Sequence, residues 1–288
     1  MAVDRLRIAT RGSQLALAQA HWVGDRITRS HPAMRIELVE VTSAGDLDRV
    51  SPVATLTDVG AFVRAVQEAV LEGRADVAVH SCKDLPVAGP AELRPIYPHR
   101  EAPWDVLCGS TLEGLPPGAR IGTGSPRRSA QLCRLRPDFI IENIRGNVDT
   151  RLGKVASGEI DGVVLAEAGL RRIGRTEAIG QRFTLAQMVP APGQAALGVE
   201  VLAGSETADV VSVIEDETTR IAVETERTIL ARTGAGCRAA LGAYAAIDDD
   251  GTIELHGFVD DGAGARTAAV RGSTPAEAAE RLIRALGL

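Results

Sequence analysis

The sequence lacks the features that would assign it to a membrane or to a nucleic acid. Its 288 residues contain no apolar run near the roughly 20 residues that a membrane-spanning helix needs. The first five residues show no basic segment before an apolar stretch, so no signal peptide is expected. The net charge of −6, from 32 basic and 38 acidic residues, argues against general nucleic-acid binding. We therefore expect a cytoplasmic protein with no membrane or nucleic-acid partner.

Cysteine is scarce and lysine is nearly absent. The cysteines Cys82, Cys108, Cys133 and Cys237 form no C-x-x-C pair and have no zinc-finger spacing, so no metal site is expected. We expect free thiols, and for Cys82, Cys108 and Cys133 a structural role as small buried side chains. Lys83 is one of only two lysines among 32 basic residues, and it marks a place where a compact, titratable charge is useful.

Strand-like and helix-like patterns alternate along most of the chain, as in α/β proteins. Strands are predicted at 6–10, 35–42, 76–80, 120–123, 139–144, 162–166 and 197–201. Helices are predicted at 62–70, 126–136, 148–157 and about 218–232. A further helix is predicted to begin at about residue 13, and a short one to end at residue 172. Proline- and glycine-rich segments at 86–103 and 190–194 indicate lobe boundaries. Three further strands and a capping box at 274–277 predict a small C-terminal α+β domain.

Polar clusters follow the ends of several predicted strands, where open α/β sheets bind ligands and helix N-termini favour anions. They lie at 10–13, 83–84, 122–128, 145–151 and 172. In the third cluster Ser125 is a good N-cap, so Arg127 and Arg128 oppose the helix dipole by about 0.3–1 kcal/mol each. An anionic ligand explains this placement, and two solvated surface arginines explain it equally well. No phosphate-binding glycine motif is present, so carboxylates and phosphates both remain open.

Two further residues have both a functional and a structural interpretation. Neighbouring cations would keep Asp84 ionised, but an aspartate beside a lysine is more often an ion pair than a catalyst, by roughly three to one. Cys237 lies in a glycine-flanked loop that gives a thiol access to solvent, although its position alone favours a structural role.

Seven ordered segments resemble the porphobilinogen deaminase (hydroxymethylbilane synthase) family. They are TRGSQLALAQA, GRADVAVHSCKDLP, GTGSPRRSAQL, IRGNVDTRLGKV, VLAEAGLRRIG, PAPGQAALGVE and GAGCRAALGAY, and they span residues 10–244. The resemblance implies two doubly wound lobes like those of type II periplasmic binding proteins, with the active site in their cleft, and a small α+β domain. The implied domains are 1–98 with 196–216, then 99–195, then 217–288.

The resemblance implies a monomeric transferase of tetrapyrrole (haem) biosynthesis. Such an enzyme joins four porphobilinogen molecules head to tail with loss of ammonia, and then releases hydroxymethylbilane with water. It implies a dipyrromethane cofactor, bound as a thioether to Cys237, and Asp84 as the catalytic carboxylate. The implied cofactor- and substrate-binding residues are Arg11, Ser13, Lys83, Ser125, Arg127, Arg128, Arg145, Arg151 and Arg172. The alternatives are a non-enzymatic two-lobed carboxylate-binding module and a paralogue defective in elongation.

Four positions, at three places in the chain, depart from the family pattern. Ala195 replaces the second glycine of a G-Q-G turn, which affects the expected backbone there. Asp58-Val59 replaces a Lys-Gly pair in a loop expected to cover the cleft, and Ala240 replaces a proline after the cysteine. Since none of them touches Asp84 or Cys237, we expect an active enzyme.

Overall fold

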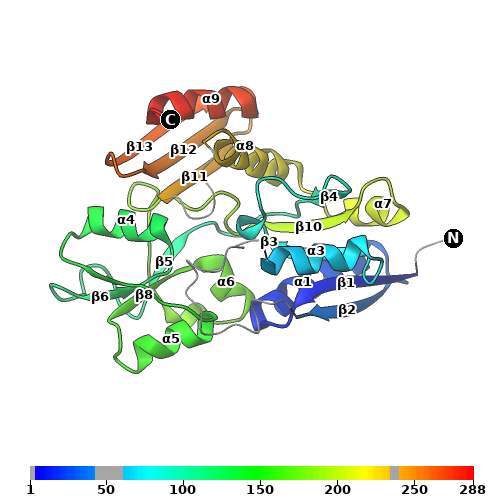
Figure 1. The fold of residues 1–288 in the computed structure, drawn as a ribbon, viewed down its shortest axis with the longest axis horizontal. Coiled ribbons are helices and arrows are strands. Elements are labelled where there is room, and N and C mark those ends of the chain that lie inside the picture. The colour runs from blue at the N-terminus through cyan, green and yellow to red at the C-terminus, as the bar shows by residue number, and fades with distance from the viewer. Residues whose placement is uncertain (1–3, 43–60, 234–239) are drawn as a thin grey trace. The chain divides into compact units, whose positions relative to one another are not determined.

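The structure is a computed structural model of the chain and describes residues 4–42, 61–233 and 240–288, with the side chains of 61 and 62 left undescribed. The chain forms two compact units (Figure 1). The first consists of 1–100 with 196–220, and the second of 101–195 with 221–288.

The first unit is built on a five-stranded sheet of order β2-β1-β3-β10-β4. The strands are β1 (Arg5–Arg11), β2 (Arg35–Val41), β3 (Val77–Ser81), β4 (Leu93–Ile96) and β10 (Leu197–Leu202). β1 is parallel to β2 and β3, whereas β10 is antiparallel to β3 and β4. The β10 pairing returns the chain to the first sheet after a long excursion.

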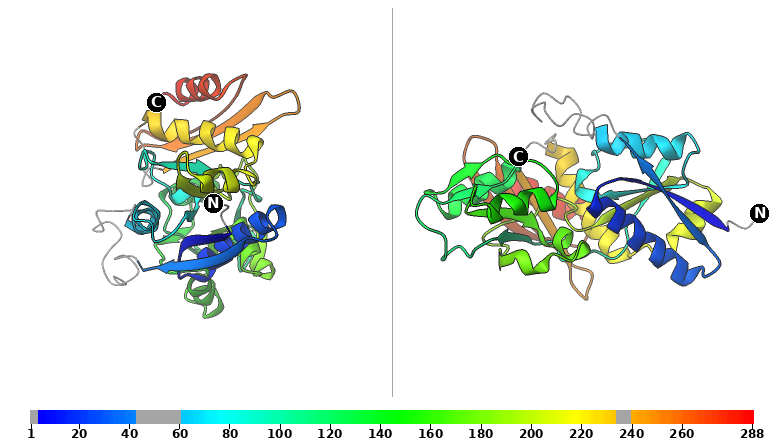
Figure 2. Two further views of the ribbon diagram at one scale, coloured as in Figure 1. Left: turned by 90° about the vertical axis from the view of Figure 1, so that its right-hand side faces the viewer. Right: turned by 90° about the horizontal axis from the view of Figure 1, so that it is seen from below.

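Helices cover both faces of this sheet (Figure 2). They are α1 (Gln14–Ser30), α3 (Ala61–Leu71) and α7 (Glu206–Ser212), with a short 3-10 turn η1 (Cys82–Asp84) after β3. α1 packs on the face that carries Ile8 and Val79, and α3 packs on the opposite face with Ala9 and Ala78. Residues alternate between these faces because successive strand side chains point in opposite directions.

The second unit contains a sheet with the same plan, in the order β7-β6-β8-β5-β9. Its strands are β5 (Asp105–Cys108), β6 (Arg120–Gly122), β7 (Ile140–Glu142), β8 (Gly162–Ala166) and β9 (Ile179–Arg182). β6 is parallel to β7 and β8, and β5 is antiparallel to its neighbours. The helices are α4 (Pro126–Leu135), α5 (Val148–Ala156) and α6 (Glu167–Arg172), with a 3-10 turn η2 (Thr176–Ala178). The predicted architecture of two doubly wound lobes is confirmed, since helices also pack on both faces of this second sheet.

A third, antiparallel sheet completes the second unit. It consists of β11 (Ala240–Ile247), β12 (Ile253–Asp260) and β13 (Ala265–Gly272), and it packs with α8 (Glu217–Thr233) and α9 (Pro275–Leu286). Thr274 caps α9 by accepting a 3.2 Å hydrogen bond from the Glu277 N–H, as the capping box predicts. α4 contacts all three strands. Because this sheet and the second lobe share one compact unit, the three-domain division stays a prediction.

Most of the predicted helices and strands are present in the structure, but several short elements of the structure were not predicted. β8 has the predicted bounds, and α4, α5 and β6 differ from theirs by one residue. The interpretation of 86–103 as a loop is wrong at β4, and β5, β9 and α7 were not predicted. β4 is an edge strand of four residues that contains Pro95, and prolines are tolerated at edges because no partner needs their missing N–H.

Candidate functional site

The predicted residues of the first unit meet at one edge of its sheet. Arg11 ends β1, and Ser13 caps α1 by accepting a 3.3 Å hydrogen bond from the Ala16 N–H. Lys83 and Asp84 lie in η1, directly after β3. Since β1 and β3 are parallel neighbours, their carboxyl ends lie side by side.

Asp84 is an exposed carboxylate at this edge. Its side chain has no hydrogen-bond or ion-pair partner among the residues that the structure describes. The other interpretation of Asp84, an ion pair with the adjacent lysine, is therefore not found among the described residues. The carboxylate is free to contact a ligand at the carboxyl end of β3.

The second unit has an equivalent edge, formed by the carboxyl ends of its parallel strands β6, β7 and β8. Ser125 lies between β6 and α4 and caps α4, accepting a 3.4 Å hydrogen bond from the Arg128 N–H. Arg145 follows β7, and Arg151 in the first turns of α5 donates to the Gly146 carbonyl over 2.8 Å. Arg172 ends α6, which follows β8. The predicted residues thus follow the carboxyl ends of β6, β7 and β8 in the chain.

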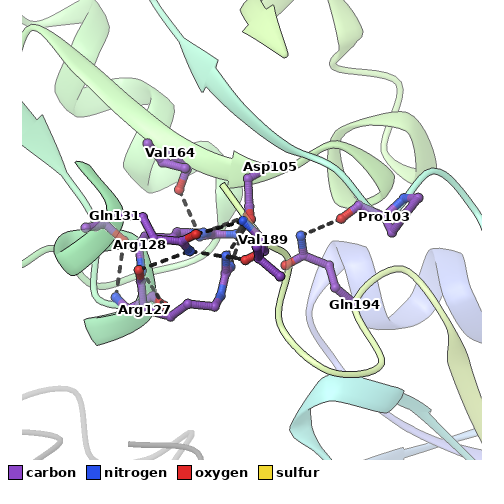
Figure 3. Close-up of polar contacts among 10 residues, drawn as sticks. Pro103, Asp105, Arg127, Arg128, Gln131, Val164, Val189 and Gln194 are labelled. Carbon is purple, nitrogen blue, oxygen red and sulfur yellow. Dashed lines mark hydrogen bonds and ion pairs between the residues drawn. The ribbon is translucent and has the colours of Figure 1, made fainter. Parts of the chain in front are cut away.

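Arg127 and Arg128 are buried and share one carboxylate (Figure 3). Arg127 donates from both terminal nitrogens to Asp105, over 2.7 and 3.2 Å. Arg128 donates to Asp105 Oδ1 from Nε over 2.8 Å, and its Nη2 lies 2.7 Å from the same oxygen. The arginines are only 3% and 6% exposed, so the alternative of two solvated surface arginines is wrong. The Asp105 carboxylate therefore explains in part why two cations lie at the start of α4.

Further hydrogen bonds fix the two guanidinium groups in place. Arg127 Nη1 also donates to the Val189 carbonyl over 2.7 Å, and Arg128 Nη1 donates to the Val164 carbonyl over 2.9 Å. The Gln131 side chain accepts from the Val189 N–H over 2.7 Å and donates to its carbonyl over 3.1 Å. Burial lowers the pKa of Arg127 even though Asp105 opposes this. Arginine nevertheless stays charged, since its ordinary pKa is above 12.

The buried cluster has more positive than negative charge. Two guanidiniums contact a single carboxylate, and Arg127 Nε is buried with no hydrogen-bond partner in the described part of the chain. An unbalanced buried charge is costly, and an anionic group on a ligand would lower that cost. The residues therefore fit a ligand that carries carboxylates.

Arg172 is held by the residue that departs from the family pattern. Its Nη2 donates to the Ala195 carbonyl over 2.5 Å, and burial lowers its pKa to about 10 although Glu101 opposes the shift. Ala195 has a φ of 71°, the left-handed conformation that glycine adopts without strain. The structure thus explains why a glycine suits this position, and it shows that alanine retains the turn.

The cysteine predictions have mixed outcomes. Cys82 and Cys108 are buried, as predicted, and burial raises the pKa of Cys108 to about 12. The prediction is wrong for Cys133, which is exposed because it lies on the outer side of α4. Cys237, Asp58 and Val59 lie outside the described residues. Within the described ranges, no group of three or more potential metal ligands occurs.

The segment that follows Cys237 is tied to the arginine cluster. β11 begins at Ala240, and the Ala243 N–H donates to the Pro190 carbonyl over 3.0 Å. Pro190 is adjacent to Val189, which accepts the hydrogen bond from Arg127. A Cβ at Gly242 would lie 2.8 Å from the Val189 carbonyl oxygen, so glycine permits this close approach. β11, which begins three residues after Cys237 in the sequence, is therefore hydrogen-bonded next to the residue that holds Arg127.

Sequence reasoning missed the residues that organise this cluster. Asp105 and Gln131 were not singled out, and neither was Gln194, whose side chain donates to the Pro103 carbonyl over 2.7 Å. The one usable signal was indirect: two adjacent arginines at a helix start require a nearby anion, which a protein carboxylate can supply as well as a ligand. Nothing in the local sequence marks Asp105 as that carboxylate.

Comparison with known proteins gives consistent matches over nearly the whole chain. Residues 6–209 match the family model described as porphobilinogen deaminase, dipyromethane cofactor binding domain, and residues 220–286 match the C-terminal domain of the same family. The chain is 41% identical to the porphobilinogen deaminase of Roseiflexus castenholzii, covering 89% of this chain and 86% of that protein. It is 47% identical to the porphobilinogen deaminase of Mycolicibacterium paratuberculosis, with 86% and 80% covered.

Substrate-binding domain 2 of Lactococcus lactis GlnP superposes with a TM-score of 0.45 at 12% identity, covering 80% of this chain and 91% of that domain. Among the described helices, none is long and apolar enough to cross a membrane. Since the family models match well over half of the sequence and the relatives exceed 40% identity, the chain belongs to the porphobilinogen deaminase family.

Proposed function

We propose that this chain is a hydroxymethylbilane synthase, a transferase that joins four porphobilinogen molecules head to tail and releases hydroxymethylbilane. The observation that carries the proposal is the agreement between family membership and two sheet edges lined with cationic side chains. Each pyrrole of substrate and product bears an acetate and a propionate. Arginine forks are well matched to such carboxylates.

The residues fit the dipyrromethane cofactor of the family. When bound, this group supplies the primer pyrrole to which the new units are joined. Cys237 would hold it as a thioether, and Arg127 and Arg128 would contribute the surplus positive charge of the Asp105 cluster. Ser125, Arg145, Arg151 and Arg172 at the same sheet edge, with Arg11, Ser13 and Lys83 in the first unit, complete the proposed carboxylate-binding set.

Asp84 is the proposed catalytic residue. As the substrate's aminomethyl C–N bond breaks, ammonia leaves and positive charge spreads over the pyrrole ring. The Asp84 carboxylate stabilises this charge by accepting a hydrogen bond from the pyrrole N–H. When bound, the cofactor would supply the pyrrole carbon to which the substrate carbon is joined, and in this proposal the Asp84 carboxylate accepts the proton released by that joining. Because it is exposed and has no partner among the described residues, the carboxylate is available for both tasks.

Intact mass spectrometry and a turnover assay test these assignments. The purified protein should carry a two-pyrrole adduct that is lost in Cys237→Ser, and Asp84→Asn should keep the adduct but lose nearly all turnover. Asp25→Asn, a change at an exposed carboxylate on α1, is the matched control and should be fully active. If the measured mass equals that of the unmodified chain, the result would instead support a reversible carboxylate-binding module. If the wild-type protein carries the adduct but forms no product, the result would support an elongation-defective paralogue.

We also propose that the enzyme acts as a monomer in the cytoplasm. The free thiols of Cys82, Cys108 and Cys133 suit a reducing compartment. Light scattering on the loaded protein should give the mass of a single chain, and a dimer mass at micromolar concentration would contradict the proposal.

A further inference from the structure

Asp84 lies at the end of a short turn that follows β3. η1 comprises only Cys82–Asp84, and Ser81 at its start makes no capping hydrogen bond with its side chain. The Leu85 N–H donates to the Cys82 carbonyl over 3.1 Å, which closes the turn. A single turn of this kind does not fix a side chain by itself, so its orientation depends on how the end of β3 is held.

A buried polar group holds β3 from the α3 face of the sheet. His80 Nε2 lies at an ion-pair distance of 3.2 Å from Glu200 Oε2, without hydrogen-bond geometry. Glu200 accepts hydrogen bonds from the Gln67 side chain over 2.9 and 3.0 Å. The three residues belong to β3, β10 and α3, and none is more than 7% exposed. Leu85 packs on the same face, since a Cβ at Gly198 would lie 2.5 Å from its side chain.

The opposite face supplies a second, independent contact. Gln19 on α1 is buried and donates to the Ser81 hydroxyl over 2.8 Å. The backbone adds a third contact, because the Cys82 N–H donates to the Ala196 carbonyl over 3.0 Å. The last residues of β3 and the first residue of η1 are thus held by contacts from α1, α3 and β10.

Stability alone does not explain a buried carboxylate at this place. Glu200 lies between Val199 and Val201 on a strand where an apolar side chain would avoid the cost of desolvating a charge. We propose that Glu200, with Gln67 and His80 on one face and Gln19 on the other, positions the Asp84 turn for catalysis. This inference rests on the proposed catalytic role of Asp84. A displacement of about 1 Å at a reacting group can reduce the rate about a hundredfold.

Two substitutions on opposite faces test the proposal. Glu200→Gln keeps the shape but places an amide N–H₂ group against the Gln67 donor, and Gln19→Met keeps the volume but removes the hydrogen bond to Ser81. In both variants kcat should fall by about ten- to a hundredfold. KM should stay within about twofold because the arginines are untouched, and intact mass should show full cofactor loading.

Asp76→Asn is the matched control at the other end of β3. Asp76 accepts hydrogen bonds from the Arg7 side chain over 2.7 and 3.1 Å, just before the strand begins. This variant should lower the melting temperature but leave kcat within about twofold of the wild type. Unchanged kcat in both Glu200→Gln and Gln19→Met would overturn the proposal, as would an equal fall in kcat for Asp76→Asn.

The role of Asp84 is tested separately. If Asp84→Asn retains wild-type turnover, the catalytic assignment fails, and the positioning proposal falls with it. If Asp84→Asn is inactive and both positioning variants are fully active, the catalytic assignment stands and only the positioning proposal is wrong.

Discussion

Ala195 allows a direct measurement of the strain in one turn. It has a φ of 71° and is the only residue other than glycine with a positive φ in the described ranges. An L-residue pays about 1–2 kcal/mol in this region because its Cβ approaches a carbonyl oxygen. Ala196, the next residue, is also buried but does not share this conformation. Glycine at either position removes the same methyl group, but only at 195 does it also remove strain.

The expected magnitudes follow from three contributions. Loss of a buried methyl group costs about 0.8 kcal/mol, and the greater freedom of glycine in the unfolded chain costs about 0.4–1 kcal/mol. Ala196→Gly should therefore lower the free energy of unfolding by about 1–2 kcal/mol. At Ala195 the relief of about 1–2 kcal/mol offsets this loss, so Ala195→Gly should be close to neutral.

Urea unfolding followed by far-UV circular dichroism measures both variants against the wild type. The informative quantity is the difference between the two, about 1–2 kcal/mol in favour of Ala195→Gly. Using adjacent positions keeps the lost surface and the added chain entropy the same in both variants. If the two variants lose equal stability, alanine is not strained at position 195, and the reasoning is refuted.

Three further predictions concern ionisable groups. Asp105→Asn should destabilise the protein by about 3–5 kcal/mol, because two buried guanidiniums lose their carboxylate, and a loss below 1 kcal/mol in urea unfolding would contradict this. Burial opposes ionisation of Asp76, but hydrogen bonds from Arg7 hold its pKa below the ordinary value. Its stabilisation is therefore complete above about pH 4 and is lost as the pH falls through the lowered pKa, so Asp76→Asn should flatten the acid limb of a pH–Tm curve. In the native protein at pH 8, iodoacetamide should modify Cys133, whereas buried Cys82 and Cys108 should react only after unfolding, as peptide mass mapping would show.

The sequence predicts the parts of the fold that have local signals. Ser13 and Ser125 are capping residues, and α1 and α4 begin directly after them. β4 and β9 are edge strands of four residues without such a local signal, and each is held by antiparallel pairing with one neighbouring strand. Local pattern therefore predicts the helices and the parallel strands better than the edges of the sheets.

The site residues divide in the same way. Their positions after β1, β3, β6, β7 and β8 follow from the alternation of strands and helices. The partners of Arg127 could not be predicted, because Asp105 and Val189 lie 22 and 62 residues away in the chain. Only folding brings them together, so the sequence left open whether a ligand or the protein balances the arginine charges.

The structure shows that the protein itself balances part of the charge of the arginine cluster. Asp105 balances one of two buried charges, and we propose that a ligand carboxylate balances the other. The same groups also fasten the protein chain: Arg127 binds the Val189 carbonyl, and Pro190 accepts from Ala243 in β11, shortly after Cys237. A change that releases Asp105 would therefore disturb the binding charges and the anchoring of β11 together. Stability and cofactor loading should decline in parallel for substitutions in this cluster, whereas at the Asp84 turn kcat should fall while loading is retained.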